Sequence, residues 1–362
     1  MSQQSEIPRT MQAVICHGPG DYRLGEVPTP LADSGEVVIK VEACGVCASD
    51  VKCFSGAPLF WGDSSRPAYV ESPVVPGHEF VGRVVSMGPC CEPTGLKIGD
   101  RVLSEQIVPC WRCRSCRRGS YHLCVENRIY GFRQAVQGAM AEYMKFPAGA
   151  LIHRVPEDLT VQQAALIEPL ACSMHAVERS RMDLGDVVVI AGAGTLGLGM
   201  VAAARLRNPA RLVALDRFDH RLSLARQIGA DLALNVDRDD VESAVAEMTD
   251  GFGCDVFIEA TGHPDAVNVG LRLLRKGGTF VEFSVMARET STDWTIIGDS
   301  KELTIYGAHL GPGCYPKVID YLARGMLRTE GIVTHEYPLD RFAEAFDLVH
   351  SGGNSIKVLL RP

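Results

Sequence analysis

The stretch "VVVIAGAGTLG", Val187–Gly197, decides the fold of the central part of the chain. Its four leading apolar residues predict a buried strand, and Gly192, Gly194 and Gly197 form the pattern G-x-G-x-x-G before an apolar helix. In this pattern the first glycine permits a tight turn, the second lets the backbone approach a pyrophosphate, and the third lets helix and strand pack closely. Because the helix N-terminus presents free N–H groups, we predict a dinucleotide site here.

A second apolar strand, "RLVALD", follows and ends at Asp216, nineteen residues after Gly197. An acid at this place accepts hydrogen bonds from the adenosine ribose hydroxyls and repels a 2′-phosphate, which favours NAD over NADP. Arg217 and Arg221 follow directly and could hold a phosphate instead. We therefore count Arg221, with Asp216 and the three glycines, among the cofactor-binding candidates.

Strand-like and helix-like runs alternate around this motif. "DVFIEATG" and "GGTFVEFSV" are predicted strands, and the run between them has a helical period. This βαβ rhythm predicts an α/β fold with a doubly wound parallel sheet over residues 167–308. Short β-rich runs between Gly and Pro turns predict an antiparallel, partly barrel-like domain over residues 1–166, completed by a helix and a strand from residues 309–362.

The composition restricts the class of protein. The chain has 362 residues, enough for two domains, and its formal net charge of −8 argues against a nucleic-acid partner. The polar N-terminus "MSQQSEIPRTMQ" has no apolar segment typical of a secretory signal. Residues 187–206 are long enough for a membrane span, but their β-branched start and glycine cluster favour the strand, turn and helix. We expect a cytoplasmic protein with no membrane partner, in a compartment where disulfides are rare.

Four of the thirteen cysteines lie close together in "CWRCRSCRRGSYHLC", at Cys110, Cys113, Cys116 and Cys124. This spacing lets four thiolates meet at one tetrahedral point, and four protein ligands leave no open position, which predicts a structural zinc. The arginines between them favour the thiolate form. The alternatives are an iron–sulfur cluster, a redox CxxC pair or a nucleic-acid-binding zinc ribbon. The reducing compartment and the acidic chain favour zinc.

A second candidate metal site is spread over the segments "ACGVCASDVK" (43–52), "PGHEF" (76–80) and "IEPL" (167–170). Together they offer the thiolate of Cys47, the imidazole of His78 and the carboxylates of Glu79 and Glu168, a donor set suited to zinc. A catalytic zinc takes three protein ligands and keeps one position for water or substrate, and either glutamate could be the third ligand. Taken alone, each segment is weak, since a single cysteine is usually a small buried residue.

The ordered set of motifs resembles the zinc-containing medium-chain alcohol dehydrogenases over essentially the whole chain. These motifs are, in order, "CGVCASD", "PGHEFVGRVV", "GDRV", "CWRCRSCRRGSYHLC", "IEPL" and "GAGTLG". The resemblance implies a GroES-like catalytic domain with a structural zinc lobe at residues 105–125, a Rossmann NAD-binding domain, two zinc ions, and a dimer or tetramer. "IEPL" resembles the polyol (sorbitol-type) branch. The long segment between Cys47 and His78, with "SEQIVPCW" and "GAHLGP", is most similar to dehydrogenases of the four-carbon polyols erythritol and threitol. The chain itself offers Leu303–Leu310 as a pairing edge.

The reaction that this resemblance implies is oxidation of a short polyol to the ketose, with hydride passing to the nicotinamide. Zinc at the second site would lower the pKa of the substrate hydroxyl, Ser49 would accept or pass the proton, and Asp50 would orient the ligand histidine. A pair that caps the turn is the alternative for Ser49 and Asp50. Lys52 occupies the position where many members carry a relay histidine. We therefore expect water relayed through Glu168 to replace that relay.

The sequence gives less information about the residues that contact the substrate. Three aromatic residues of the long segment would either wall the pocket or pack in the core: Phe54, Phe60 and Trp61. A buried hydroxyl without a partner costs about 1–3 kcal/mol, so a polyol needs polar partners, for which the candidates are Ser49, Glu168, Asp63, Ser64 and Arg66. Alternative substrates are sorbitol, xylitol, threonine or a simple diol. A non-catalytic nucleotide-binding protein is the other class, which an intact set of zinc ligands argues against.

Overall fold

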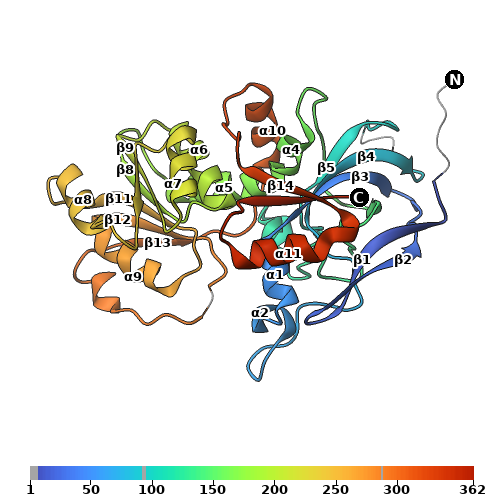
Figure 1. The fold of residues 1–362 in the computed structure, drawn as a ribbon, viewed down its shortest axis with the longest axis horizontal. Helices are drawn as coiled ribbons and strands as arrows, with labels where there is room; N and C mark the ends of the chain where they lie inside the picture. The colour runs from blue at the N-terminus through green and yellow to red at the C-terminus, as the bar shows by residue number, and fades with distance from the viewer. Residues whose placement is uncertain (1–6, 92–94, 287) are drawn as a thin grey trace. The chain divides into compact units, whose positions relative to one another are not determined.

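The computed structural model describes residues 7–91, 95–286 and 288–362. The chain forms two compact units, Met1–Glu168 with Val333–Pro362, and Pro169–Ile332 (Figure 1). The first six residues, part of the polar N-terminal stretch considered above, lie outside the described residues. No helix in the described part of the chain is long and apolar enough to cross a membrane.

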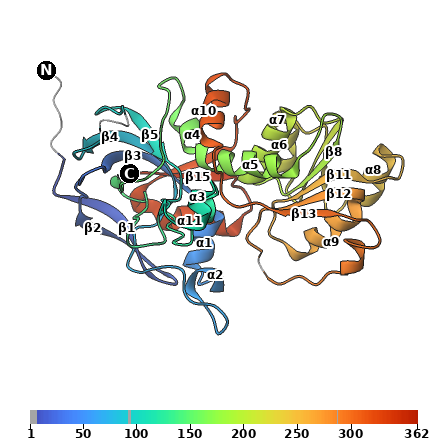
Figure 2. The same ribbon diagram turned by 180° about the vertical axis from the view of Figure 1, so that it is seen from behind.

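The second unit contains, within the described residues, a six-stranded parallel sheet in the order β10-β9-β8-β11-β12-β13. Strand β8 lies in the middle of the sheet, β9 and β10 are added on one side of it, and β11, β12 and β13 are then added on the other. This is the strand order of a doubly wound nucleotide-binding sheet, so the predicted fold class is confirmed. Figures 1 and 2 show α6 and α7 beside one face of this sheet and α9 beside the other. The strands are β8 (Val187–Ala191), β9 (Arg211–Asp216), β10 (Leu232–Asn235), β11 (Cys254–Glu259), β12 (Leu274–Glu282) and β13 (Thr304–Gly307). The helices are α5 (Ile167–Ser180), which begins in the first unit, α6 (Thr195–Arg205), α7 (Asp219–Ile228), α8 (Val241–Met248), α9 (Pro264–Leu273) and α10 (Tyr315–Ala323).

The glycine-rich motif forms the predicted strand, turn and helix. The β-branched run of β8 is almost entirely buried between β9 and β11, and α6 begins directly after Gly194. Gly192 adopts a φ of +97°, a conformation that favours glycine. A Cβ atom at Gly197 would overlap the carbonyl oxygen of Gly192, so the third glycine lets the helix approach the turn.

The structure places residues 309–332 in the second unit, where the sequence analysis had counted them with the first domain. Helix α10 lies in this segment and buries Tyr315, Val318 and Leu322. Lys317 on the same helix pairs with Glu178 of α5 at 2.6 Å. Because these contacts join segments far apart in sequence, the local pattern did not predict them.

The first unit is built on a mostly antiparallel sheet in the order β14-β15-β3-β4-β5-β7, with β6 also paired to β3, beside a hairpin of β1 and β2. The expected return of the C-terminal strand to the first domain is confirmed, because β15 pairs with β3. The strands are β1 (Thr10–Gly18), β2 (Asp21–Pro28), β3 (Val37–Val46), β4 (Glu79–Met87), β5 (Arg101–Ser104), β6 (Tyr143–Phe146), β7 (Ile152–Arg154), β14 (Val333–Pro338) and β15 (Lys357–Arg361). The helices are α1 (Ala48–Phe54), α2 (Pro58–Trp61), α3 (Arg114–Arg117), α4 (Val161–Ala165) and α11 (Phe342–Ser351).

Candidate functional site

The first unit brings Cys47, His78 and Glu79 together at the ends of two paired strands. Cys47 directly follows β3, and Glu79 opens β4, opposite Gly45 of β3. Their ligand atoms all lie within 4.8 Å of one another. A Cβ atom at Gly45 would overlap the Glu79 carboxylate, so the glycine makes room for this acid. One thiolate, one imidazole and one carboxylate are a donor set that fits a zinc ion.

Two residues of α1 contact the imidazole of His78. Asp50 lies with Oδ1 3.4 Å from His78 Nδ1, and its Oδ2 accepts a hydrogen bond of 2.9 Å from the backbone N–H of Cys47. Ser49 Oγ lies 3.4 Å from His78 Nε2. Burial disfavours the charged imidazolium, but the Asp50 carboxylate and Cys47 outweigh it and raise the pKa of His78 well above its ordinary value. Asp50 thus caps the helix and contacts the histidine at the same time.

Lys357, which the sequence analysis missed, lies beneath this group. Its ammonium, in a side chain that is only 4% exposed, donates to Glu79 Oε2 and to the carbonyl oxygen of Val46 at 3.3 Å. Burial lowers the pKa of Lys357, but the charges of Glu79, Cys47 and Glu168 outweigh burial, so the pKa lies above its ordinary value. The available signal was a lysine inside the apolar C-terminal run "IKVLL".

Glu168, the fourth predicted ligand, does not join the group of three. It is buried near the start of α5, and its Oε1 accepts a hydrogen bond from Nε2 of Gln106, which is also buried. Gln106 lies in the segment "SEQIVPCW", where no local pattern distinguishes it. Of the two glutamates left open as the third ligand, the structure groups Glu79 with Cys47 and His78.

The four clustered cysteines meet as their spacing predicts. The sulfur atoms of Cys110, Cys113, Cys116 and Cys124 lie within 4.8 Å of one another, and all are free thiols. Backbone N–H groups point at them, for example that of Cys116 at 3.5 Å from the sulfur of Cys113. This N–H and that of Val125 lower the pKa of Cys113 to about 6, which favours the thiolate that a metal needs. The set fits a four-coordinate zinc.

In the second unit, Asp216 contacts the glycine turn. Its Oδ2 accepts a hydrogen bond of 2.7 Å from the N–H of Ala193, between the first two glycines, and its Oδ1 accepts from the N–H groups of Arg217 and Phe218. Arg217 pairs with Asp237 at 3.3 Å. Arg221 lies 4.8 Å from the centre of the Phe218 ring. The carboxylate therefore stands at the end of β9, beside the turn predicted to bind the pyrophosphate.

The aromatic candidates of the long segment have different surroundings. Phe54 packs edge-on against Tyr22 and Phe346 in an aromatic cluster. Phe60 stacks on Phe132 at 5.3 Å, and Phe132 in turn lies 5.4 Å from the His78 ring. Phe132, which no sequence pattern singles out, is therefore the aromatic residue that packs against the ring of His78.

The other candidates of that segment lie at its surface. The indole N–H of Trp61 donates to the carbonyl oxygen of Cys53 at 2.7 Å. Asp63 and Arg66 form a partly exposed ion pair of 3.1 Å, and Ser64 beside them is exposed. Asp63 also accepts hydrogen bonds from the N–H groups of Ser65 and Arg66, so the ion pair and these bonds stabilise the turn itself.

The fold and the two cysteine-containing groups define a class: a metal-binding oxidoreductase with a separate dinucleotide-binding unit. The family models agree with it, since residues 33–157 match the alcohol dehydrogenase GroES-like domain and residues 195–324 match the zinc-binding dehydrogenase domain. The chain belongs to the zinc-type medium-chain alcohol dehydrogenase family, in its polyol branch.

Individual relatives agree with this assignment. The chain is 51% identical over 359 residues to the erythritol/L-threitol dehydrogenase of Mycolicibacterium smegmatis, covering 99% of both chains. It is 34% identical over 358 residues to the D-arabitol-phosphate dehydrogenase of Enterococcus avium, covering 97% of both. A zinc-binding dehydrogenase of Sinorhizobium meliloti 1021, solved with bound NADP, has a TM-score of 0.87 and 28% identity, covering 98% of this chain and 99% of that one.

Proposed function

We propose that the chain oxidises a four-carbon polyol, such as erythritol or threitol, to the ketose, with NAD as the hydride acceptor and zinc as the metal. The observation that carries the substrate class is the 51% identity to an erythritol/L-threitol dehydrogenase over 99% of both chains. Sorbitol, xylitol, threonine or a simple diol is the alternative substrate within the same mechanism.

Cys47, His78 and Glu79 would hold the catalytic zinc. When bound, the metal would act as a Lewis acid that polarises the substrate hydroxyl and lowers the pKa of that hydroxyl. Asp50, whose Oδ1 lies 3.4 Å from His78 Nδ1, would orient the imidazole, and Nε2 lies on the side of Ser49. Ser49, whose Oγ lies 3.4 Å from His78 Nε2, would accept or pass the hydroxyl proton. Lys52 stands where a relay histidine is common in the family, so the proton would continue through water at Glu168.

The preference for NAD rests on Asp216. Its carboxylate is held at the end of β9 by backbone N–H groups, and an acid at this place would repel a 2′-phosphate. Arg217 is paired with Asp237, and Arg221 lies over Phe218, which supports NAD over NADP. The Sinorhizobium meliloti structure contains NADP, so a protein of this fold can bind the other coenzyme. Measuring the preference of this chain for NAD over NADP therefore tests the role of Asp216.

The four-cysteine lobe would hold a second, structural zinc. We further propose that the protein works in the cytoplasm, where its thirteen thiols stay reduced, and that it forms a homo-oligomer. Strand β13, inside the stretch predicted as a pairing edge, is the last strand of its sheet and supports this pairing. A non-catalytic nucleotide-binding role is the alternative class, and the intact ligand group speaks against it.

The test is NADH formation on a panel of erythritol, D- and L-threitol, xylitol, sorbitol, 2,3-butanediol and threonine, with and without a zinc chelator. We expect chelator-sensitive turnover that is strongest on a four-carbon polyol. Replacement of Cys47 by Ala should abolish turnover but leave NADH binding intact, whereas Cys90→Ala, at an exposed cysteine, should change neither. Turnover near the wild-type level in the Cys47 variant would refute the catalytic site.

The panel also separates the substrate from the mechanism. Chelator-sensitive turnover that is strongest on another member would keep the mechanism and discard the four-carbon substrate. No turnover on any member, from protein shown by metal analysis to hold zinc, would favour the non-catalytic class.

A further inference from the structure

Two acids at the ends of neighbouring strands in the second unit have no role in the function proposed above. Glu259 is the last residue of β11, Glu282 is the last residue of β12, and the two are paired in register. Two residues earlier, Phe257 and Phe280 are paired in the same way, and their rings stack at 5.4 Å. Because residues i and i+2 of a strand share a face, the two acids lie side by side on the face that carries these rings.

One oxygen atom of each acid is buried without a partner. Glu259 is 0% exposed, and its Oε1 accepts hydrogen bonds from the N–H groups of Thr261 at 2.7 Å and Gly262 at 3.0 Å. Within the described residues, Oε2 of Glu259 and Oε1 of Glu282 have no hydrogen-bond partner. Since a buried acceptor without a partner is costly, these two atoms indicate a proton or a ligand at this place.

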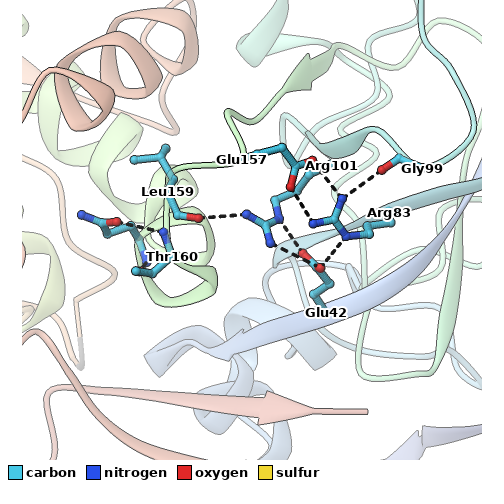
Figure 3. Close-up of polar contacts among 8 residues, drawn as sticks. Glu42, Arg83, Gly99, Arg101, Glu157, Leu159 and Thr160 are labelled. Atoms are coloured by element: carbon cyan, nitrogen blue, oxygen red, sulfur yellow. Dashed lines mark hydrogen bonds and ion pairs between the residues drawn. The ribbon is translucent and has the colours of Figure 1, made fainter.

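Other acids of the chain are neutralised by a cation. Figure 3 shows Glu42 of the first unit between two guanidinium groups, those of Arg83 at 2.9 Å and Arg101 at 2.7 Å. In the part of the chain that the structure describes, neither Glu259 nor Glu282 has such a partner. Two adjacent carboxylates without a cation cannot both ionise easily, so they share one proton. In agreement, burial and then the charge of Glu259 raise the pKa of Glu282 to about 7.

The charged groups on the neighbouring elements leave this pair without compensation. On α5, Arg179 donates to a carbonyl oxygen of β13 at 3.1 Å. Desolvation lowers the pKa of His309, which follows β13, so its imidazole is neutral near pH 7. In the first turn of α9 and before it, Asp265 and His263 are 80% and 57% exposed and lie 3.7 Å apart. The charge that acts on Glu282 is that of its neighbour on β11. The pair therefore carries one negative charge with the shared proton and two without it.

The pair is located where the second half of a dinucleotide binds. A doubly wound sheet has two mononucleotide-binding halves, and the dinucleotide lies across the carboxyl ends of the strands, where the strand order reverses. Strands β8, β9 and β10 form the half with the glycine turn and Asp216, so β11, β12 and β13 form the half for the nicotinamide nucleotide. Glu259 and Glu282 end the first two strands of this half. The turn after Glu259 also contacts the glycine motif, since a Cβ atom at Gly192 would overlap the carbonyl oxygen of Ala260.

We propose that Glu282, paired with Glu259, is a specificity-determining residue that favours binding of NAD over NADH once the shared proton is lost. This inference rests on the proposed function, in which a nicotinamide coenzyme accepts the hydride. The nicotinamide ring carries a positive charge in NAD and none in NADH, whereas the phosphates are the same in both. A carboxylate near the ring therefore stabilises bound NAD relative to bound NADH, and its effect on the phosphates cancels in the ratio of the two affinities.

The experiment measures the dissociation constants of NADH, by its fluorescence, and of NAD, by competition, in the absence of substrate. It compares wild type with Glu282→Gln, which keeps the size and removes the charge, and with Glu282→Asp, which keeps the charge. Glu247→Gln, at an exposed glutamate of α8, is the control. Near pH 8.5 the preference of Glu282→Gln for NAD over NADH should be about threefold to tenfold weaker than that of wild type, because its pair carries one negative charge instead of two.

Near pH 6 the wild-type pair holds its proton and also carries one negative charge. The preference of Glu282→Gln should therefore equal that of wild type within about twofold. Glu282→Asp should retain a preference that rises with pH, and Glu247→Gln should match wild type at both pH values.

The outcomes separate this inference from the proposed function. A preference in Glu282→Gln that equals the wild-type value at both pH values, or that differs from it by the same factor at both, would overturn the role of Glu282 while the proposed function stands. Loss of the pH-dependent preference in Glu282→Asp as well would also overturn it, because the charge is then not the cause. A wild-type protein that binds neither NAD nor NADH would refute the proposed function and this inference with it.

Discussion

Two carboxyl groups lie side by side at the carboxyl end of the parallel sheet in the second unit. Glu259 ends β11, Glu282 ends β12, and the two are paired in register. Glu259 accepts hydrogen bonds from the N–H groups of Thr261 and Gly262 through Oε1. Within the described residues, Glu259 Oε2 and Glu282 Oε1 are buried without a hydrogen-bond partner. Burial, and then the charge of Glu259, raise the pKa of Glu282 to about 7.

This shift makes the stability of the apo protein depend on pH. A rise from 4.5 to about 7 means that the folded state binds the proton of Glu282 more tightly than the unfolded chain does. The tighter binding of this proton in the folded state therefore stabilises the protein. This stabilisation is fully present below about pH 4.5 and is lost as the pH rises through about 7. At 1.36 kcal/mol per pKa unit the loss would be about 3 kcal/mol. Since the side chain is only partly buried, solvent screening reduces this to about 1–2 kcal/mol.

Replacement of Glu282 by Gln removes the charge at every pH. We expect Glu282→Gln to be more stable than wild type by about 1–2 kcal/mol at pH 8.5 and equal to it near pH 5, measured by urea unfolding without coenzyme. Glu247→Gln, at an exposed glutamate of α8, is the control and should show no such pH-dependent difference. A Glu282→Gln variant whose stability differs from wild type by the same amount at both pH values would refute the reasoning.

Two further predictions concern other buried charges. Lys357→Met leaves the Glu79 carboxylate buried without its cation, so the metal-free protein should lose about 3–5 kcal/mol of unfolding free energy, measured by urea unfolding; a loss below 1 kcal/mol would contradict this. Asp216→Gly removes the charge that would repel a 2′-phosphate, so the ratio of kcat/KM for NAD over NADP should fall by about tenfold or more, and an unchanged ratio would mean that Asp216 does not set the preference.

The parts of the fold that the sequence predicted depend on neighbouring residues. The strand, turn and helix from Val187 to Arg205 follow from a β-branched run, three glycines and an alanine-rich stretch within twenty residues. The four-cysteine group follows from its own spacing. The group of Cys47, His78 and Glu79 needed more than local pattern, because its segments are weak alone and gained weight from the family resemblance.

The residues that were missed act through contacts that no local pattern records. Lys357 reaches Glu79 across 278 residues, and Gln106 reaches Glu168 across 62. The lysine inside an apolar run indicates a buried charge that needs a partner but does not say which one, and a glutamine in a loop gives no such signal. Helix α10 shows the same limit, since it was counted with the first domain and the structure places it in the second unit.

These distant contacts also bear on why the first unit should hold a cation. The buried acids Glu79 and Glu168, with the thiol of Cys47, act electrostatically on the ammonium of Lys357, and the buried Asp50 lies beside His78. An excess of buried negative charge is costly unless a cation compensates it, and a divalent metal at the ligand group would do so. The same field keeps the pKa of His78 high in the metal-free protein, where a proton on the imidazole is the available substitute. Lys357 pairs with Glu79 in the interior, so this ligand candidate has a compensating cation before any metal binds.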